Sequence, residues 1–404
     1  MSDLYDVVIS GGGMVGMSLA IALARQGMSV AVIDKTNLSA QVQPAFDGRV
    51  SAVAYGSKCI LDSIGAWAGM TAEAQPILDI RVVDGDRPFF LHYDHKEAGD
   101  VPLGYIVENR YIRAALQQAA SLLPTLTLLD NQSPASIERD DVSVTLCLHS
   151  GQNLRCRLLV AADGKTSTIR SMVGIDALEW AYGQTAIVCT IAHEKPHHGL
   201  AQERFLPAGP FAVLPMQGNR SSLVWVEPED RIPLYLELSE EEFVQEIQER
   251  VGNYLGTIQT VGPRFTYPLS LMHAKSYISH RVALIGDAAH AIHPIAGQGV
   301  NLGFRDVGVL SELIGERFRL GLDIGGDDVL ASYQQWRRFD NVTMLAVTDG
   351  LNRLFGVNLL PVQLMRGFGL WAVGKMPPLK RFLMRHAMGL VGDLPKIIKE
   401  NHWH

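Results

Sequence analysis

Short apolar runs, each followed by a turn and an amphipathic stretch, open the chain. Residues 5–9 form the first apolar run, a glycine-rich turn follows at 11–16, and a helical pattern then continues to Gly27. A second apolar run ends at Asp34. Strand, turn, helix and strand in this order predict the start of a parallel sheet covered by helices.

The middle of the chain has a different pattern. Between residues 180 and 267, strand-like runs alternate with turns, and one polar helical segment at 239–255 interrupts them. This pattern predicts a mainly antiparallel sheet inserted between pieces of the parallel-sheet domain. After Asp306 the pattern is helical to the end of the chain.

The first strand end carries a dinucleotide-binding pattern. Gly11, Gly13 and Gly16 occupy the places of G-x-G-x-x-G between the predicted strand and helix. The first glycine allows a tight turn, the second admits a pyrophosphate, and the third lets the helix pack closely on the strand. Asp34, at the end of the next strand, suits ribose hydroxyls and argues against a 2′-phosphate there. The motif does not distinguish NAD from FAD.

Two later strand ends also carry an acid and a glycine. Asp163 and Gly164 follow one predicted strand, although Asp-Gly is also common in ordinary turns. The other strand, at 282–285, leads through Asp287 into a loop with glycines and then a helix from about Val300. Because a helix N-terminus has unpaired N–H groups and a partial positive charge, this stretch predicts a site for a polar, flat ligand.

Composition limits the partners. A chain of 404 residues is long enough for two or more domains, and its formal net charge of −7 argues against nucleic acid. The four cysteines lack metal-ligand spacing, which favours free thiols. The N-terminus does not resemble a signal peptide, and no apolar run approaches the roughly 20 residues that span a bilayer. These features predict a cytoplasmic protein.

The last part of the chain is basic. Residues 360–404 carry seven Lys or Arg and two Asp or Glu residues, interleaved with Leu, Phe, Trp and Met. An interfacial amphipathic helix has this composition, so we expect this tail to reach a membrane surface or a lipid-bound partner. The alternative is a helix packed on the acidic remainder of the protein or on another subunit of a homo-oligomer.

The motifs together resemble a known family. GGGMVG with Asp34, DGKTSTIR and GDAAHAIHPIAGQGVN are similar to the flavoprotein aromatic hydroxylases of the para-hydroxybenzoate hydroxylase type. Within that family the chain most resembles the bacterial ubiquinone-biosynthesis hydroxylases, through stretches such as GRVSAVAYGS, GYIVEN and HPIAGQGVNLGFRD. This second resemblance covers nearly the whole chain.

The resemblance implies non-covalent FAD. Asp34 would hold the adenosine ribose, Asp287 the ribityl chain, and the N–H groups at 299–301 the N1/O2 edge of the flavin, where a helix N-terminus stabilises negative charge. From the residues alone, Arg49 has two interpretations, a phosphate contact or a pair with Asp47. The implied cofactor-binding residues are Gly11, Gly13, Met14, Val15, Gly16, Asp34, Arg49, Asn109, Asp163, Gly164, Asp287, Gly297, Gly299, Val300 and Asn301.

The implied chemistry is that of the cofactor. NAD(P)H or another electron donor reduces FAD, O₂ adds at C4a, and the flavin hydroperoxide transfers one oxygen atom to an aromatic ring. No metal is required, and no acid–base residue is assigned. Pro294 is expected to shape the front face of the flavin, whereas His290 and His293 are expected to be structural or solvent-facing rather than general bases.

The predicted fold class is α/β: a Rossmann-like FAD-binding domain, an inserted mainly antiparallel substrate domain and a helical C-terminal region. We expect the FAD-binding domain over 1–75, 100–179 and 268–340, the substrate domain over 76–99 and 180–267, and the C-terminal region over 341–404. A second G-x-G-x-x-G motif is absent, which favours transient docking of NAD(P)H over a separate nicotinamide domain.

The inserted sheet indicates the substrate. Its strand patterns FAVLPM and SSLVWVEP contain no Arg or Lys to pair with the carboxylate of a small acid. They offer Phe211, Val213, Leu214, Met216, Leu223 and Trp225, about half of which must face the other side of the sheet. We therefore predict a polyprenylated phenol of ubiquinone biosynthesis, hydroxylated on its ring, and peripheral association with the inner membrane. A small soluble aromatic substrate, a flavin-dependent reductase and a non-catalytic member of a biosynthetic assembly remain alternatives.

Overall fold

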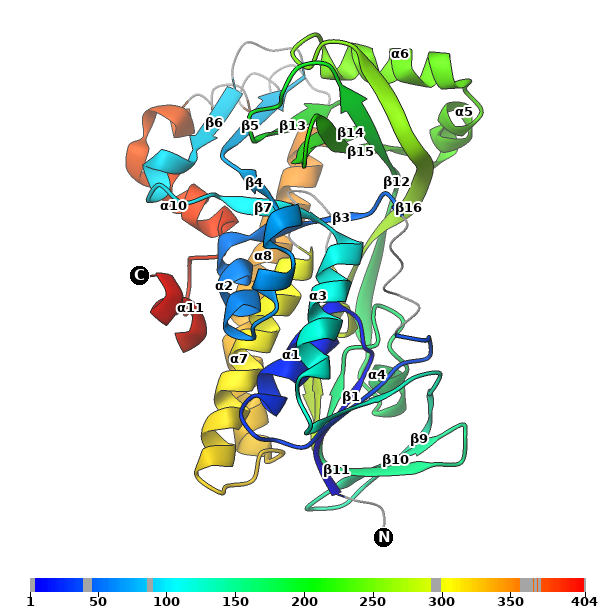
Figure 1. The fold of residues 1–404 in the computed structure, drawn as a ribbon, viewed down its shortest axis with the longest axis vertical. Coiled ribbons are helices and arrows are strands. Elements are labelled where there is room, and N and C mark those ends of the chain that lie inside the picture. Colours follow the sequence, from blue (N-terminus) through cyan, green and yellow to red (C-terminus); the bar gives the residue numbers. More distant parts are fainter. Residues whose placement is uncertain are drawn as a thin grey trace.

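The computed structural model describes residues 4–38, 46–85, 90–291, 299–356, 366, 369 and 372–402. The molecule is elongated, with the parallel sheet and its helices toward one end and an antiparallel sheet toward the other (Figure 1). Pro294, Gly297 and His293, together with most of the stretch from 357 to 371, lie outside the described residues.

The first sheet is the parallel one that the N-terminal pattern predicts. Its parallel strands run in the order β18-β11-β1-β2-β8, with β17 antiparallel at one edge and the β9–β10 hairpin paired to β11. The central residues Val7–Ile9 and Leu158–Ala161 are fully buried, as expected when helices cover both faces. The strands are β1 (Leu4–Ser10), β2 (Val30–Ile33), β8 (Leu126–Leu129), β9 (Pro134–Arg139), β10 (Val144–Leu148), β11 (Asn153–Ala161), β17 (Ile278–Ser279) and β18 (Val282–Leu284).

The second sheet has the order β19-β16-β12-β15-β14-β13-β5-β6 and is antiparallel except between β5 and β13. One face packs under α5 and α6 at the upper right of Figure 1, through a core that includes Trp225 and Phe243. The elements are β5 (Asp79–Asp84), β6 (Phe90–Asp94), β12 (Ala177–His193), β13 (Leu200–Leu206), β14 (Gly209–Met216), β15 (Arg220–Pro228), α5 (Ile232–Leu236), α6 (Glu240–Val251), β16 (Ile258–Ala274) and β19 (His290–Ala291).

A small third sheet, in the order β3-β7-β4, lies between the two large ones. It is formed by β3 (Val50–Ala54), β4 (Gln75–Ile77) and β7 (Gly104–Glu108). The helices of this half are α1 (Met14–Ala24), α2 (Tyr55–Ser63), α3 (Asn109–Ser121) and α4 (Thr168–Met172). The predicted limits at 179/180 and 267/268 fall inside β12 and β16, two strands of 17 residues each, and the domain boundaries stay a prediction.

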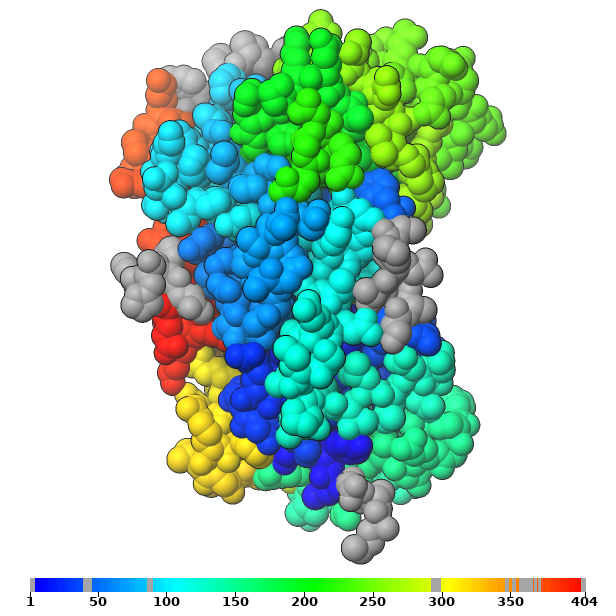
Figure 2. All heavy atoms as spheres, in the orientation of Figure 1, coloured from blue at the N-terminus to red at the C-terminus, as the bar shows by residue number. Residues whose placement is uncertain are grey.

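The chain ends in helices, as predicted, and the expected α/β fold class is confirmed. These helices are α7 (Gly299–Arg319), α8 (Asp327–Gly356), α10 (Pro377–Ala387) and α11 (Lys396–His402). Figure 2 shows the orange residues of α10 against the cyan residues that follow β6, where Lys380 pairs with Glu97 at 2.6 Å. Among the described residues, no helix is both long and apolar enough to cross a bilayer.

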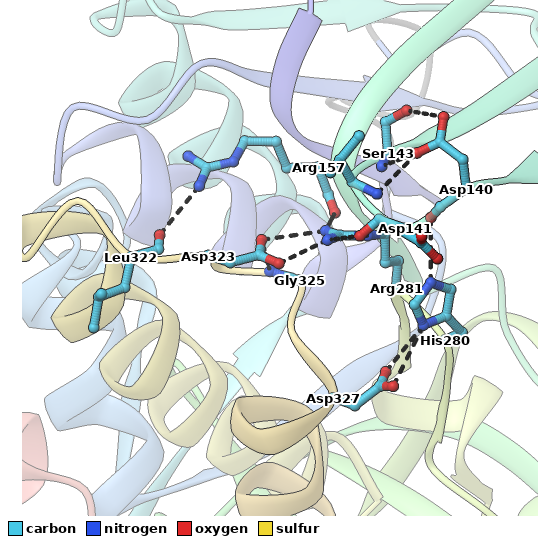
Figure 3. A network of polar contacts seen from close by, with 11 residues as sticks. Asp140, Asp141, Ser143, Arg157, His280, Arg281, Leu322, Asp323, Gly325 and Asp327 are labelled. Atoms are coloured by element: carbon cyan, nitrogen blue, oxygen red, sulfur yellow. Dashed lines mark hydrogen bonds and ion pairs between the residues drawn. The ribbon is translucent and has the colours of Figure 1, made fainter.

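A polar network anchors β18, the strand that leads into the third motif (Figure 3). The buried guanidinium of Arg281 donates to the carbonyl oxygens of Asp141 and Arg157 and pairs with Asp323 at 2.6 Å. His280 Nδ1 lies 3.2 Å from a carboxylate oxygen of Asp327. These contacts fix the start of β18 against the α7–α8 connection and the turn of the β9–β10 hairpin.

Candidate active site

The glycine turn after β1 contains glycines that internal packing requires and one that faces open space. A Cβ atom at Gly11 would overlap the carbonyl of Ala162, and one at Gly16 would overlap the carbonyl oxygen of Gly11. A Cβ at Gly13 would meet no atom of the residues that the structure describes within 4 Å. Gly13 precedes α1 without a side-chain cap, and the first turn of that helix carries no acid. The turn therefore leaves an open, electropositive helix start, as a pyrophosphate requires.

Asp34 is tied to this turn by its carboxylate. One oxygen accepts a hydrogen bond from the N–H of Gly12 at 2.7 Å, and the other accepts from the N–H and hydroxyl of Thr36 at 2.8 and 2.6 Å. The side chain is partly exposed at the end of β2. Asp34 thus shapes the glycine turn, and its ribose contact stays a prediction.

The helices α1 and α7 begin beside each other. Met14 and Val15 form the first turn of α1 and are half-buried. A Cβ at Gly303 in α7 would overlap the side chain of Val15, and a Cβ at Gly286 would also contact it. Close packing through Val15 therefore places the first and third motifs against each other.

The third motif presents an acid at its turn. Gly286–Ala288 forms a short 3-10 turn in which Asp287 is exposed while its neighbours are buried. Although its carboxylate is open to solvent, most of the surrounding volume is protein, and this desolvation raises the pKa of Asp287. His290 and Lys165 act in the opposite direction and favour the charged form. The turn therefore offers a hydrogen-bond acceptor to a ligand that carries hydroxyl groups.

The start of α7 is held against β3 by Asn301. Its side-chain amide donates to the carbonyl oxygen of Ala52 and its side-chain oxygen accepts from the N–H of Ala54, both at 2.8 Å. A Cβ at Gly299 would meet no atom of the described residues within 4 Å. Because its side chain is engaged with β3, Asn301 positions the start of α7 against the small sheet. Val300 lies between these residues and is half-buried.

Arg49 and Asn109, which the sequence also predicts to bind FAD, have protein partners of their own. Arg49 pairs with Asp47 at 2.8 Å, so the local ion pair is present, and its phosphate contact stays a prediction. The side-chain oxygen of Asn109 accepts a hydrogen bond from Ser51 Oγ at 2.7 Å. Arg49, Asn109 and Asn301 all line the cavity described below, although 192 positions separate the last two.

The second motif caps α4 and connects this helix to the third motif. Asp163 accepts hydrogen bonds from Ser167 Oγ and from the backbone N–H groups of Thr168 and Ile169, and so caps α4. Arg170 is buried and donates to the carbonyl oxygen of Ala288 at 3.0 Å, which joins this motif to the third. Gly164 has a φ of +84°, which favours glycine. A cofactor role for Asp163 and Gly164 stays a prediction.

A buried charged network behind the third motif was not predicted. Asp306 is fully buried and accepts from the N–H of Gly286 at 2.9 Å, from His290 Nε2 at 2.6 Å and from Arg337 Nε at 2.7 Å. Arg337 also pairs with Asp340 at 2.8 Å. His290 therefore has a structural position in the interior and does not face solvent. An acid in the middle of an otherwise apolar helix face was the one local signal of this network.

A large, mainly apolar cavity of about 720 Å³ lies between the antiparallel sheet, the small sheet and the C-terminal helices. Arg49 is the sole Lys or Arg among the described residues that line it, and Glu203 is the sole Asp or Glu. Leu383, His386 and Ala387 of α10 also contribute to the wall. The cavity thus reaches from the predicted flavin-binding residues to the C-terminal region.

The strand alternation explains which predicted apolar residues reach this cavity. Leu214 lines it, whereas Phe211, Val213, Leu223 and Trp225 face the core under α5 and α6, and Met216 packs in the main core. Instead the cavity face of the two strands includes Ala212, Ser222, Val224 and Val226. The expected apolar surface is present, but smaller side chains form most of it.

The two arginines near this sheet have protein partners. Arg204 donates to the backbone oxygens of Gly85 and Arg250 at 3.1 and 2.6 Å. Arg220 pairs with the buried Glu108 at 3.0 Å and is half-buried. Neither arginine belongs to the cavity wall.

The residues present fit FAD. In the described part of the chain, no atom lies within 4 Å of a Cβ at Gly13 or Gly299, which are at two helix starts, and Asp287 offers an exposed acceptor. A family model described as FAD binding domain matches residues 4–344. The class of protein that this fold and site define is an FAD-binding flavoprotein.

Comparison with known proteins shows which family of flavoproteins the chain belongs to. The chain is 52% identical to the ubiquinone hydroxylase UbiL of Rhodospirillum rubrum, over 95% of this chain and 89% of that protein. It is 34% identical to the 3-demethoxyubiquinol 3-hydroxylase of Escherichia coli, over 95% and 98% of the two chains. The chain belongs to this family of FAD-dependent ubiquinone-biosynthesis hydroxylases, which confirms the predicted family and its FAD cofactor.

A solved structure supports the fold. The p-nitrophenol 4-monooxygenase PnpA of Pseudomonas putida superimposes with a TM-score of 0.80 at 21% identity, covering 96% of this chain and 99% of that one. This likeness supports the arrangement of the sheets. The contacts of individual residues with FAD stay predictions.

Proposed function

We propose that this protein is an FAD-dependent monooxygenase that hydroxylates the aromatic ring of a polyprenylated phenol in ubiquinone biosynthesis. The observation that carries the proposal is the cavity of about 720 Å³, which is apolar and begins beside Arg49, Asn109 and Asn301. A ring can lie at the flavin end while an isoprenoid chain extends along the apolar walls. Burying such a chain gains roughly 25 cal/mol per Å² of apolar surface before ordering costs.

Bound FAD, reduced by NAD(P)H or another donor, supplies the oxygen-activating chemistry. The residues of this chain bind the cofactor through the open helix starts of α1 and α7 and orient the ring in the cavity. They also exclude water, because the walls of the cavity are mainly apolar. A small aromatic acid would find one arginine on the wall, and this arginine already pairs with Asp47.

The test compares two substrates. FAD-loaded protein is supplied with NAD(P)H and either 2-farnesylphenol or 4-hydroxybenzoate, and hydroxylated product is measured per reduced nicotinamide oxidised. We expect faster and better coupled hydroxylation of the prenylated phenol. Faster coupled hydroxylation of the soluble acid would contradict the proposed substrate class. Oxidation of NAD(P)H without any hydroxylated product would favour a reductase.

The proposal extends to a membrane surface at α10, which forms part of the cavity wall. Met376, Leu379 and Phe382 are exposed, with Met376 and Phe382 just over half exposed, and Arg381 and Arg385 are exposed on the same helix. Apolar and basic side chains together suit a bilayer with anionic lipids. A prenylated substrate could pass from such a surface into the cavity, since α10 forms part of its wall.

Vesicle binding tests this extension. Co-sedimentation with vesicles containing anionic lipid should fall when Phe382 and Leu379 are both changed to Ser. The matched control is Leu234→Ser, because Leu234 is 63% exposed on α5 at the opposite side of the molecule. Equal binding by the wild type, the double variant and the control would contradict a role for α10.

A further inference from the structure

Glu203 stands in the cavity wall among apolar residues. On β13, Ala201, Glu203 and Phe205 point to the same face of the sheet, and all three line the cavity. The residues paired with Glu203 on the neighbouring strands are Ala212 of β14 and Val82 of β5, which also line it. A carboxyl group therefore interrupts a cross-strand row of small and aliphatic side chains.

This carboxyl group has no protein partner in the part of the chain that the structure describes. No hydrogen bond or ion pair joins Glu203 to another described side chain or backbone group. Desolvation raises the pKa of Glu203 to about 7. A carboxyl group in an apolar environment is costly unless something bonds to it, so its presence favours a ligand with a complementary polar group.

The position along β13 indicates which part of a ligand reaches Glu203. Ala201, two residues earlier, pairs with Ile80 of β5 and belongs to the main hydrophobic core, and the step is about 7 Å along a strand. Phe205, one step the other way, stacks on Phe355 of α8 with ring centroids 3.8 Å apart. Glu203 thus lies between the main-core end of β13 and the stacked pair of Phe205 and Phe355.

We propose that Glu203 binds the ring hydroxyl of the substrate and thereby sets the position of the ring in the cavity. This role rests on the proposed function. The ring hydroxyl donates a hydrogen bond to the carboxylate, and the isoprenoid chain extends along the apolar walls of the cavity. A hydrogen bond to a charged acceptor is stronger than one to a neutral group, so Glu203 selects rings that carry a free hydroxyl over rings whose oxygen is methylated.

The test measures binding, so that it does not depend on turnover. FAD-loaded wild type, Glu203→Gln and Glu203→Leu are titrated with 2-farnesylphenol and with its methyl ether, and the change in flavin fluorescence gives the affinity. Both variants should lose about tenfold or more in affinity for the phenol and little for the ether. The control is Glu241→Gln on the exposed face of α6, which should leave both affinities unchanged.

Two further measurements separate binding from structural support. The affinity of the wild type for the phenol should rise as the pH increases through about 7, where Glu203 ionises, and this rise should be absent in Glu203→Gln. Glu203→Leu should unfold at the same or a higher temperature than the wild type, because it removes an unpaired carboxyl group. A structural role would instead lower the unfolding temperature.

The outcomes are distinguishable. Equal losses for phenol and ether, or an unchanged affinity for the phenol, would overturn the role of Glu203 while leaving the proposed function intact. A wild type that binds neither compound would overturn the proposed function and the role of Glu203 together.

Discussion

His290 Nε2 lies 2.6 Å from a carboxylate oxygen of Asp306, and the two side chains are only 1% and 0% exposed. Burial alone would raise the pKa of Asp306, but His290 and Arg337 outweigh it and lower the pKa below its usual value. The same carboxylate oxygen accepts from the N–H of Gly286, the first residue of the turn that presents Asp287. The pair of Asp306 and His290 therefore fixes the Gly286–Ala288 turn on its buried side.

Breaking this network should destabilise the protein strongly. Arg337→Met leaves the buried Asp306 with one fewer positive partner, and losing one member of a buried ion pair costs about 3–5 kcal/mol. Thermal unfolding of the FAD-loaded protein measures the effect. The control is Lys58→Met, which breaks the more exposed pair with Asp62 and should cost no more than ~1 kcal/mol. Similar unfolding temperatures for the two variants would contradict this account.

The glycines of the first motif should separate folding from cofactor binding. A methyl group at Gly16 would overlap protein backbone, so Gly16→Ala should lower the unfolding temperature even without FAD. A methyl group at Gly13 meets no atom in the described part of the chain, so Gly13→Ala should leave the FAD-free protein stable and weaken FAD binding by about tenfold or more. Unfolding scans of the FAD-free proteins and FAD titrations measure both effects. An unchanged FAD affinity in Gly13→Ala would place the pyrophosphate elsewhere.

Asp287→Ala should weaken FAD binding by roughly 1.5–3 kcal/mol, the usual contribution of a hydrogen bond to a charged group. Glu240→Ala, on the surface helix α6, should have little effect and serves as the control. Because the pKa of Asp287 is raised, FAD affinity should increase with pH as this carboxyl ionises. Equal FAD affinities of Asp287→Ala and Glu240→Ala would contradict a contact between Asp287 and FAD.

His273 should make stability depend on pH. Burial, with the nearby His290 and Arg338, lowers the pKa of His273 from 6.5 to about 4. The unfolded chain therefore binds the proton first, and roughly 3 kcal/mol of stability is lost as the pH falls from 6.5 to about 4. His273→Gln should flatten the pH dependence of the unfolding temperature in this window. His280→Gln, at an exposed position, should not.

The features that could be predicted from the sequence are those that depend on residues close together in the chain. The three strand-end motifs, the helical end of the chain and the alternation of the inserted sheet follow from local periodicity, and the motifs do contact one another through Val15 and Arg170. Local patterns could not show that Glu203 and Leu214 face a cavity while Trp225 faces a core, because α5 and α6 decide which face is covered. Local patterns also could not predict the ion pair between Asp306 and Arg337, because these residues lie on two different helices that meet only in the folded protein.

The order of strands in the parallel sheet also constrains when the protein can assemble during synthesis. β1 emerges from the ribosome first, yet its neighbour β11 begins at Asn153, and β11 waits in turn for β18 at Val282. Until then the nascent chain carries an apolar strand edge without its partner, which is a risk for aggregation. The α10 wall of the cavity comes last of all, so a chain that has already formed its dinucleotide fold still lacks an enclosed substrate site.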